Sequence, residues 1–78
     1  MSYDYYAEAR KLAQLLKDEG LNERGEKVLS SLEEGFTATE ILMVIRWNLN
    51  ELLSTELGSA EARSCARRLA EKIDIIMK

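Results

Sequence analysis

The sequence predicts an all-α fold, a small four-helix bundle whose helices run up, down, up and down. Three observations predict it: proline is absent, apolar residues repeat at three- and four-residue steps, and glycines fall near the segment boundaries. The helices are expected over about 3–19, 22–34, 38–56 and 60–77, within a single domain, 1–78. Short connections favour antiparallel neighbours, and an irregular packing of the same helices is the alternative.

The segment 3–19 has one apolar stripe and a clear stop. The stripe contains Tyr5, Tyr6, Ala9, Leu12, Ala13, Leu15 and Leu16. Gly20 can adopt the left-handed conformation that ends a helix, and Leu21 can then fold back on Leu16 in a Schellman arrangement. We expect Tyr5 or Tyr6 to pack inward and Tyr3 to lie at the surface.

The segment 22–34 is expected to form the weakest helix. Asn22 is a suitable N-cap and Gly35 a suitable stop. The internal Gly25 costs about 1 kcal/mol relative to alanine, so the first turn is expected to fray. The inward positions are Val28, Leu29 and Leu32.

The last two helices have the firmest starts. Thr37 and Glu40 form a Thr-x-x-Glu capping box, in which each side chain satisfies a backbone N–H of the first turn. Ser59 follows Gly58 and is expected to cap the segment 60–77. The apolar stripe of that segment contains Ala62, Cys65, Ala66, Leu69, Ile73 and Ile76.

The segment 38–56 is apolar on two faces. One arc faces the expected core and contains Ile41, Leu42, Ile45, Leu49, Leu52 and Leu53. Met43 and Trp47 lie roughly opposite, one turn apart, and Asn50 continues that side. Because methionine and tryptophan are enriched at interfaces, we interpret Met43, Trp47 and Asn50 as a partner-binding surface. The alternative is that this helix is central in the bundle and Trp47 belongs to a second layer of core.

Carboxylates gather in the last turns of the first three helices, where the helix dipole disfavours negative charge. They are Asp18, Glu19, Glu33, Glu34 and Glu56. Such a cluster could attract a basic protein partner through long-range electrostatics. The alternative is that these are solvated charges that keep the protein soluble.

The composition argues against several classes of function. The single cysteine, Cys65, has no disulfide partner, and the chain has no histidine to act as a zinc ligand or as a base. We therefore expect no enzyme activity, no cofactor and no metal, with Cys65 as a buried apolar side chain. A formal net charge of −3 argues against nucleic-acid binding. The longest apolar run, Ile41 to Ile45, is far short of a membrane span, and without a signal peptide a cytoplasmic location is expected.

The stretch from Gly35 to Met43 (GFTATEILM), followed by Arg46-Trp47-Asn48-Leu49, resembles a pattern in small uncharacterised bacterial all-helical proteins. Some of these are suspected immunity or accessory proteins. The resemblance covers less than a quarter of the chain. It implies a bacterial origin and a role for the segment from Thr37 to Trp47, and no catalytic residue.

Two hypotheses of function follow. The first is a bacterial protein-interaction module that forms a homodimer through the outer face of the segment 38–56. The second is an immunity-type inhibitor that binds a basic toxin, or another basic protein, through the acidic helix ends.

Overall fold

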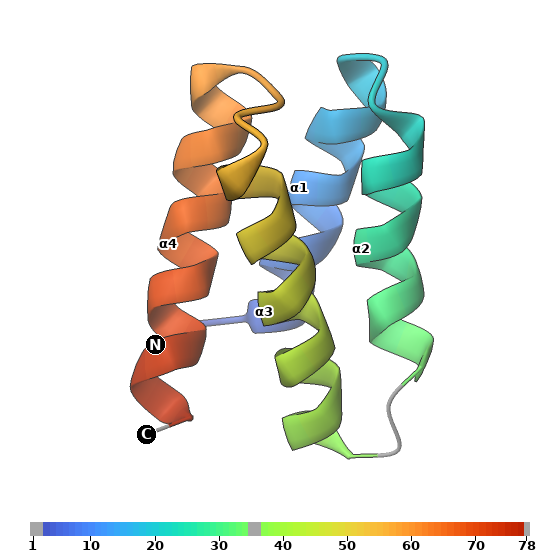
Figure 1. Cartoon of the computed structure of the whole chain (residues 1–78). Helices are drawn as coiled ribbons and strands as arrows, with labels where there is room; N and C mark the ends of the chain where they lie inside the picture. Colours follow the sequence, from blue (N-terminus) through green and yellow to red (C-terminus); the bar gives the residue numbers. More distant parts are fainter. Residues whose placement is uncertain (1–2, 35–36, 78) are drawn as a thin grey trace.

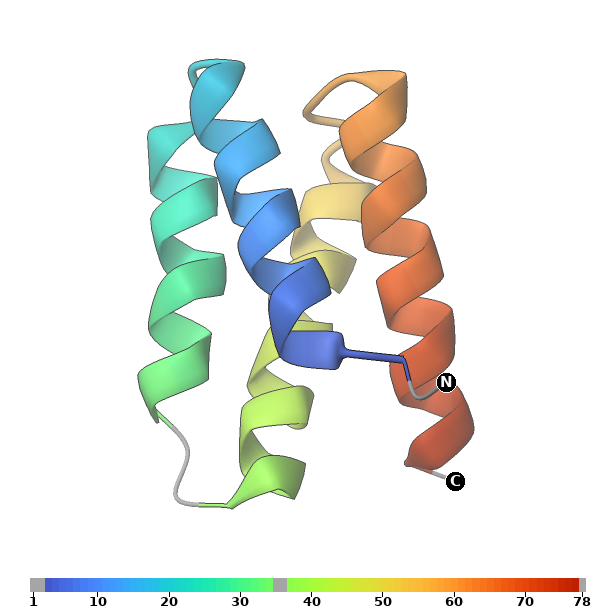
Figure 2. The ribbon, with the colours of Figure 1, turned by 180° about the vertical axis from the view of Figure 1, so that it is seen from behind.

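The computed structural model describes residues 3–34 and 37–77 and contains four helices: α1 (Tyr5–Asp18), α2 (Asn22–Glu34), α3 (Ala38–Ser54) and α4 (Ala60–Ile76). They run alternately up and down, so the predicted fold class is confirmed (Figure 1). The helices stand in a ring in which α1 packs on α2, α2 on α3, α3 on α4, and α4 on α1 (Figures 1 and 2). The turns α1–α2 and α3–α4 share one pole, and the end of α2 and the start of α3 lie at the other (Figure 1).

The core lies along the axis of this ring and contains side chains from all four helices. Its buried members are Ala9, Leu12, Ala13, Leu16, Val28, Leu42, Ile45, Leu49, Leu52, Ala62, Ala66, Leu69, Ala70 and Ile73. The stripes predicted for α1 and α3 account for their buried residues. Five of the buried residues are alanines, in α1 and α4, so these two helices contribute several short side chains to the core.

The ends of α1 are fixed by local hydrogen bonds. Asp4 is the N-cap, because its carboxylate accepts a hydrogen bond from the Ala7 N–H at 3.0 Å, and the helix therefore begins at Tyr5 rather than at residue 3. At the other end Gly20 has a φ of +85°, and the Leu21 N–H donates to the Leu16 carbonyl at 2.8 Å. The Schellman arrangement is confirmed.

Gly25 has a packing role in α2. A Cβ at this position would lie 2.8 Å from the Ala13 carbonyl oxygen of α1, so the close approach of α1 and α2 requires glycine. Asn22 is already the first helical residue, and the Gly25 N–H donates to the Leu21 carbonyl, so the prediction of Asn22 as N-cap was wrong. The predicted stop at Gly35 lies outside the described residues.

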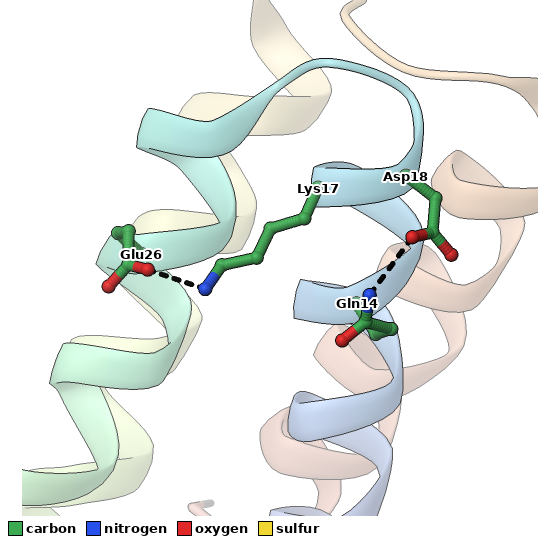
Figure 3. Close-up of polar contacts among 4 residues, drawn as sticks. All are labelled: Gln14, Lys17, Asp18 and Glu26. Atoms are coloured by element: carbon green, nitrogen blue, oxygen red, sulfur yellow. Dashed lines mark hydrogen bonds and ion pairs between the residues drawn. The ribbon is translucent and has the colours of Figure 1, made fainter.

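The Lys17 ammonium of α1 also reaches across to the Glu26 carboxylate of α2, forming an ion pair over the same seam (Figure 3).

The starts of α3 and α4 were predicted correctly. The Thr37 hydroxyl accepts a hydrogen bond from the Glu40 N–H, and the Ser59 hydroxyl accepts one from the Ala62 N–H, both at 3.1 Å. The end of α3 was placed too late, at 56 instead of Ser54. Glu56 adopts a left-handed φ of +55°, so the chain leaves the helix before Gly58.

A buried polar contact connects α2 and α3. Ser31 is fully buried, and its hydroxyl donates to the Lys27 carbonyl at 2.8 Å. The Asn48 side-chain amide donates to the Ser31 hydroxyl oxygen and, at 3.3 Å, to the same Lys27 carbonyl. Because a buried hydroxyl without partners destabilises the folded state, this network favours a single alignment of α3 on α2.

Candidate functional site

The outer face of α3 is exposed to solvent. Met43 is 57% exposed and Trp47 is 61% exposed, and Asn50 is exposed beside them. The alternative that Trp47 is a second layer of core is therefore excluded for the isolated chain. These residues occupy one side of α3 because its opposite side carries the buried Leu42, Ile45, Leu49 and Leu52.

A groove of about 420 Å³ runs between α3 and α4 next to Trp47. Its α3 wall contains Met43, Arg46, Trp47 and Asn50. Its α4 wall contains Ile73, Asp74 and Met77. Ile73 is only 1% exposed, whereas Met77 is 37% exposed, so the groove has an apolar floor and an apolar rim.

A bidentate ion pair lies within this groove. The Arg46 Nε donates to Asp74 Oδ1 at 2.8 Å, and Arg46 Nη2 donates to Asp74 Oδ2 at 3.1 Å. The hydrogen bond to Asp74 raises the pKa of the Arg46 guanidinium, and the partial burial of Arg46 opposes that shift only in part. The two charges cancel each other, so the groove combines apolar surface with a fixed, neutral polar pair.

Sequence reasoning found Met43, Trp47 and Asn50 but missed the residues that α4 contributes. Asp74 and Met77 are three positions apart and therefore share one side of α4. That spacing was visible in the sequence. Which side of α4 faces α3 was not visible, because it depends on how the four helices pack.

A second groove, of about 430 Å³, lies at the pole where α1 begins. It is lined by Tyr3, Asp4, Tyr5, Tyr6, Ala38, Leu42 and Ile76. Ile76 was predicted to face the core but is 48% exposed. Glu19, just after α1, bonds Ser59, just before α4, and α4 has 17 residues whereas α1 has 14. The last turn of α4 therefore extends past the first turn of α1 (Figure 2).

The carboxylates at the helix ends do not form one cluster. Asp18, Glu19 and Glu56 lie at the pole of the two tight turns, whereas Glu33 and Glu34 end α2 at the opposite pole. The length of α2 separates the two groups by roughly 18 Å along the bundle. Glu33 is exposed, and Glu56 lies in the turn that follows α3 rather than in its last helical turn.

Two of these carboxylates bind groups of the same chain. The Glu19 carboxylate accepts hydrogen bonds from the Ser59 backbone N–H at 2.7 Å and from the Ser59 hydroxyl at 2.5 Å. Glu19 thus lies at the N-terminus of α4, where the helix dipole favours an anion. Glu19 therefore stabilises the turn between α3 and α4. Asp18 accepts a hydrogen bond from the Gln14 amide of α1 at 2.9 Å (Figure 3).

Tyr3 and Cys65 differ from their predictions. Tyr3 was expected at the surface, but it is half-buried and packs edge to face on Tyr5. Its hydroxyl group is buried, and this burial raises the pKa of Tyr3. Cys65 is half-buried beside Glu8 and Arg68 rather than fully buried. Burial raises the pKa of the Cys65 thiol, so it is protonated at neutral pH and is a poor nucleophile.

Comparisons with protein families, with curated proteins and with solved structures found no match to this chain. The resemblance of the segment from Gly35 to Leu49 to a bacterial family stays a prediction. Among residues 3–34 and 37–77, no cluster of three or more potential ligands could hold a metal ion. No helix in those same ranges is long and apolar enough to cross a bilayer.

Proposed function

We propose that this chain is a small protein-interaction module that associates with a second copy of itself through the outer face of α3. The exposure of Trp47 beside the groove between α3 and α4 is the observation that carries this proposal. A large aromatic side chain in water next to an apolar groove is typical of an interface, where such residues contribute most of the binding energy. The bacterial origin implied by the resemblance is part of the same proposal.

The charge distribution favours a second copy over a charged partner at this face. Arg46 is the only basic residue of α3, and it is already paired with Asp74. The groove therefore offers no net charge to an acidic or a basic protein. Two copies that each carry a net charge of −3 repel one another least at the groove, where Arg46 and Asp74 neutralise each other.

Sedimentation velocity from micromolar to millimolar concentration tests this proposal. We expect the wild type to shift from monomer toward dimer, and Trp47→Ala to weaken the dimer by about 2 kcal/mol or roughly thirtyfold in dissociation constant. Met43→Ala should weaken it by a smaller amount. Ile75→Ala is the matched control, because Ile75 is 65% exposed on α4 but lines neither groove. A wild type that stays monomeric throughout would contradict the proposal.

A basic protein bound by the acidic helix ends is the second candidate, and the exposed Glu33 and the net charge of −3 are the observations in its favour. Its support is weaker, because Glu19 binds Ser59 and the two carboxylate groups lie at opposite poles. It predicts that a basic protein co-purifies and that the association rate falls as salt rises. Glu33→Gln should then slow association, with Glu8→Gln on α1 as a control.

A further inference from the structure

We infer that, in the self-association proposed above, the two copies meet with their α3 helices antiparallel, and Trp47 of each copy fills the groove between α3 and α4 of the other. The inference rests on the proposed function and adds the occupant of the groove and the direction of approach. It follows from the position of Trp47, the chemistry of the groove, the charges along α3 and the size of the face.

Trp47 and the groove are a protruding side chain and a cavity that lie side by side on one face. Trp47 is 61% exposed and forms part of the groove wall. It also borders the shallower depression on the α2 side, so it stands as a ridge along α3. A two-fold axis next to Trp47 places each indole in the groove of the other copy, so a single symmetry operation fills both grooves and buries both indoles.

The groove has the chemistry that an indole ring requires. Met43 and Met77 supply thioether sulfurs on opposite walls, and sulfur makes favourable contacts with aromatic rings. The planar Arg46 guanidinium is held in place by Asp74 and can stack on the face of the incoming indole. Asn50 also lines the groove, and its side-chain oxygen can accept a hydrogen bond from the indole N–H.

The charges along α3 favour the antiparallel arrangement. Its outer side carries Glu40 and Glu51, eleven positions apart, and no basic residue. In a parallel pair each glutamate would face the same glutamate of the second copy, which places like charges together. In an antiparallel pair centred on Trp47, Glu40 lies level with Ser54 of the second copy, and Glu51 lies level with Met43. No glutamate then faces another.

The face is large enough for a stable dimer. The molecule measures 30 × 24 × 21 Å, and α3 and α4 together form one of its long faces. A second copy that covers the whole of this face would bury at most roughly 600–700 Å² per copy, which is near the lower end of the range for specific interfaces. We therefore expect a reversible dimer rather than an obligate one.

The first experiment uses the fluorescence of Trp47, the only tryptophan in the chain. Emission spectra are recorded over the same dilution series as sedimentation velocity. We expect the emission maximum to shift to shorter wavelength in step with the dimer fraction, because the indole leaves water. A dimer that forms while the emission stays unchanged would overturn the inference and would show that another surface associates. A monomer at every concentration would instead overturn the proposed function.

The second experiment tests the direction of approach with single cysteines in a Cys65→Ser background and a short bis-maleimide cross-linker. Asn50→Cys lies beside the proposed axis and should cross-link efficiently. Ser54→Cys lies two turns from Trp47, so its two copies are about 20 Å apart along an antiparallel pair and adjacent in a parallel one. Ser64→Cys, exposed on the α1 side of α4, is the control.

Efficient cross-linking of Asn50→Cys alone is the expected result. Cross-linking of Ser54→Cys to the same extent would overturn the antiparallel arrangement, although the dimer itself would stand. Cross-linking of neither α3 variant, in a sample that sedimentation shows to be dimeric, would overturn the placement of Trp47. Circular dichroism of each variant confirms that the helices are retained before cross-linking.

Discussion

The two sides of α3 differ in what joins them to the neighbouring helix: a buried polar contact on the α2 side, called the closed side, and a partly exposed ion pair on the α4 side, called the open side. On the closed side, the fully buried Ser31 is hydrogen-bonded to Asn48 and to the Lys27 carbonyl. On the open side, the groove next to Trp47 lies between α3 and α4. The closed side fixes how the helices align, whereas the open side keeps apolar surface in water. A chain with so small a core has little stability to lose, and the apolar surface left exposed on the open side is the basis of the self-association proposed above.

The largest contrast is expected between the inner and the outer face of α3. Leu49 is fully buried, so Leu49→Ala removes its transfer free energy and leaves a cavity, which costs about 3 kcal/mol. Trp47→Ala, measured at a concentration where the chain is monomeric, should change the free energy of unfolding by less than about 0.5 kcal/mol. Urea unfolding followed by circular dichroism measures both. Similar losses for the two variants would mean that Trp47 belongs to the core.

Gly25→Ala tests the close contact between α1 and α2. Alanine favours a helix over glycine by about 1 kcal/mol, so the variant would be stabilising at an open position. Here the new methyl group meets the Ala13 carbonyl oxygen, and we expect a net loss of about 1–2 kcal/mol. Ser30→Ala on the exposed side of α2 is the control for helix propensity and should be neutral or slightly stabilising. A gain in stability for Gly25→Ala would show that α1 and α2 separate easily.

The buried Ser31–Asn48 contact should have a smaller effect. Asn48→Ala removes the amide that donates to Ser31 and to the Lys27 carbonyl, for a loss of about 1 kcal/mol. Ser31→Ala removes the hydroxyl itself and should cost a similar amount. Because both changes break the same contact, the double variant should lose clearly less than the sum. Additive losses in urea unfolding would mean that Ser31 and Asn48 act independently.

The fold could be predicted from the sequence because its determinants are local. The caps at Thr37 and Ser59, the stop at Gly20 and the apolar stripes of α1 and α3 each depend on residues within a few positions of one another. Some errors are local, such as the N-cap at Asn22, but two arise where distant segments meet. Gly25 was treated only as a loss of helix stability, because its contact with α1 is tertiary. Ile76 was assigned to the core because the sequence does not show that α4 extends past the first turn of α1.

The candidate site divides in the same way. Helical periodicity alone placed Met43 and Trp47 on the outside of α3, and both are exposed there. The contribution of Asp74 and Met77 required knowledge of how α4 is rotated about its axis. The acidic helix ends were treated as one cluster because the dipole rule considers each helix separately. It cannot reveal that Glu19 reaches the first turn of another helix.

The smallest effect on stability is expected for the ion pair of the open side. The side chains of Arg46 and Asp74 are 33% and 51% exposed, so solvent screens their attraction, and Arg46→Ala should cost the monomer less than about 0.5 kcal/mol. The same change should weaken the dimer, because Trp47 of the second copy loses the guanidinium on which it stacks. Arg46→Lys separates charge from shape: lysine keeps the charge but cannot form the planar, bidentate contact with Asp74. If Arg46→Lys dimerises as tightly as the wild type in sedimentation velocity, charge alone explains the role of Arg46, and the indole does not stack on it.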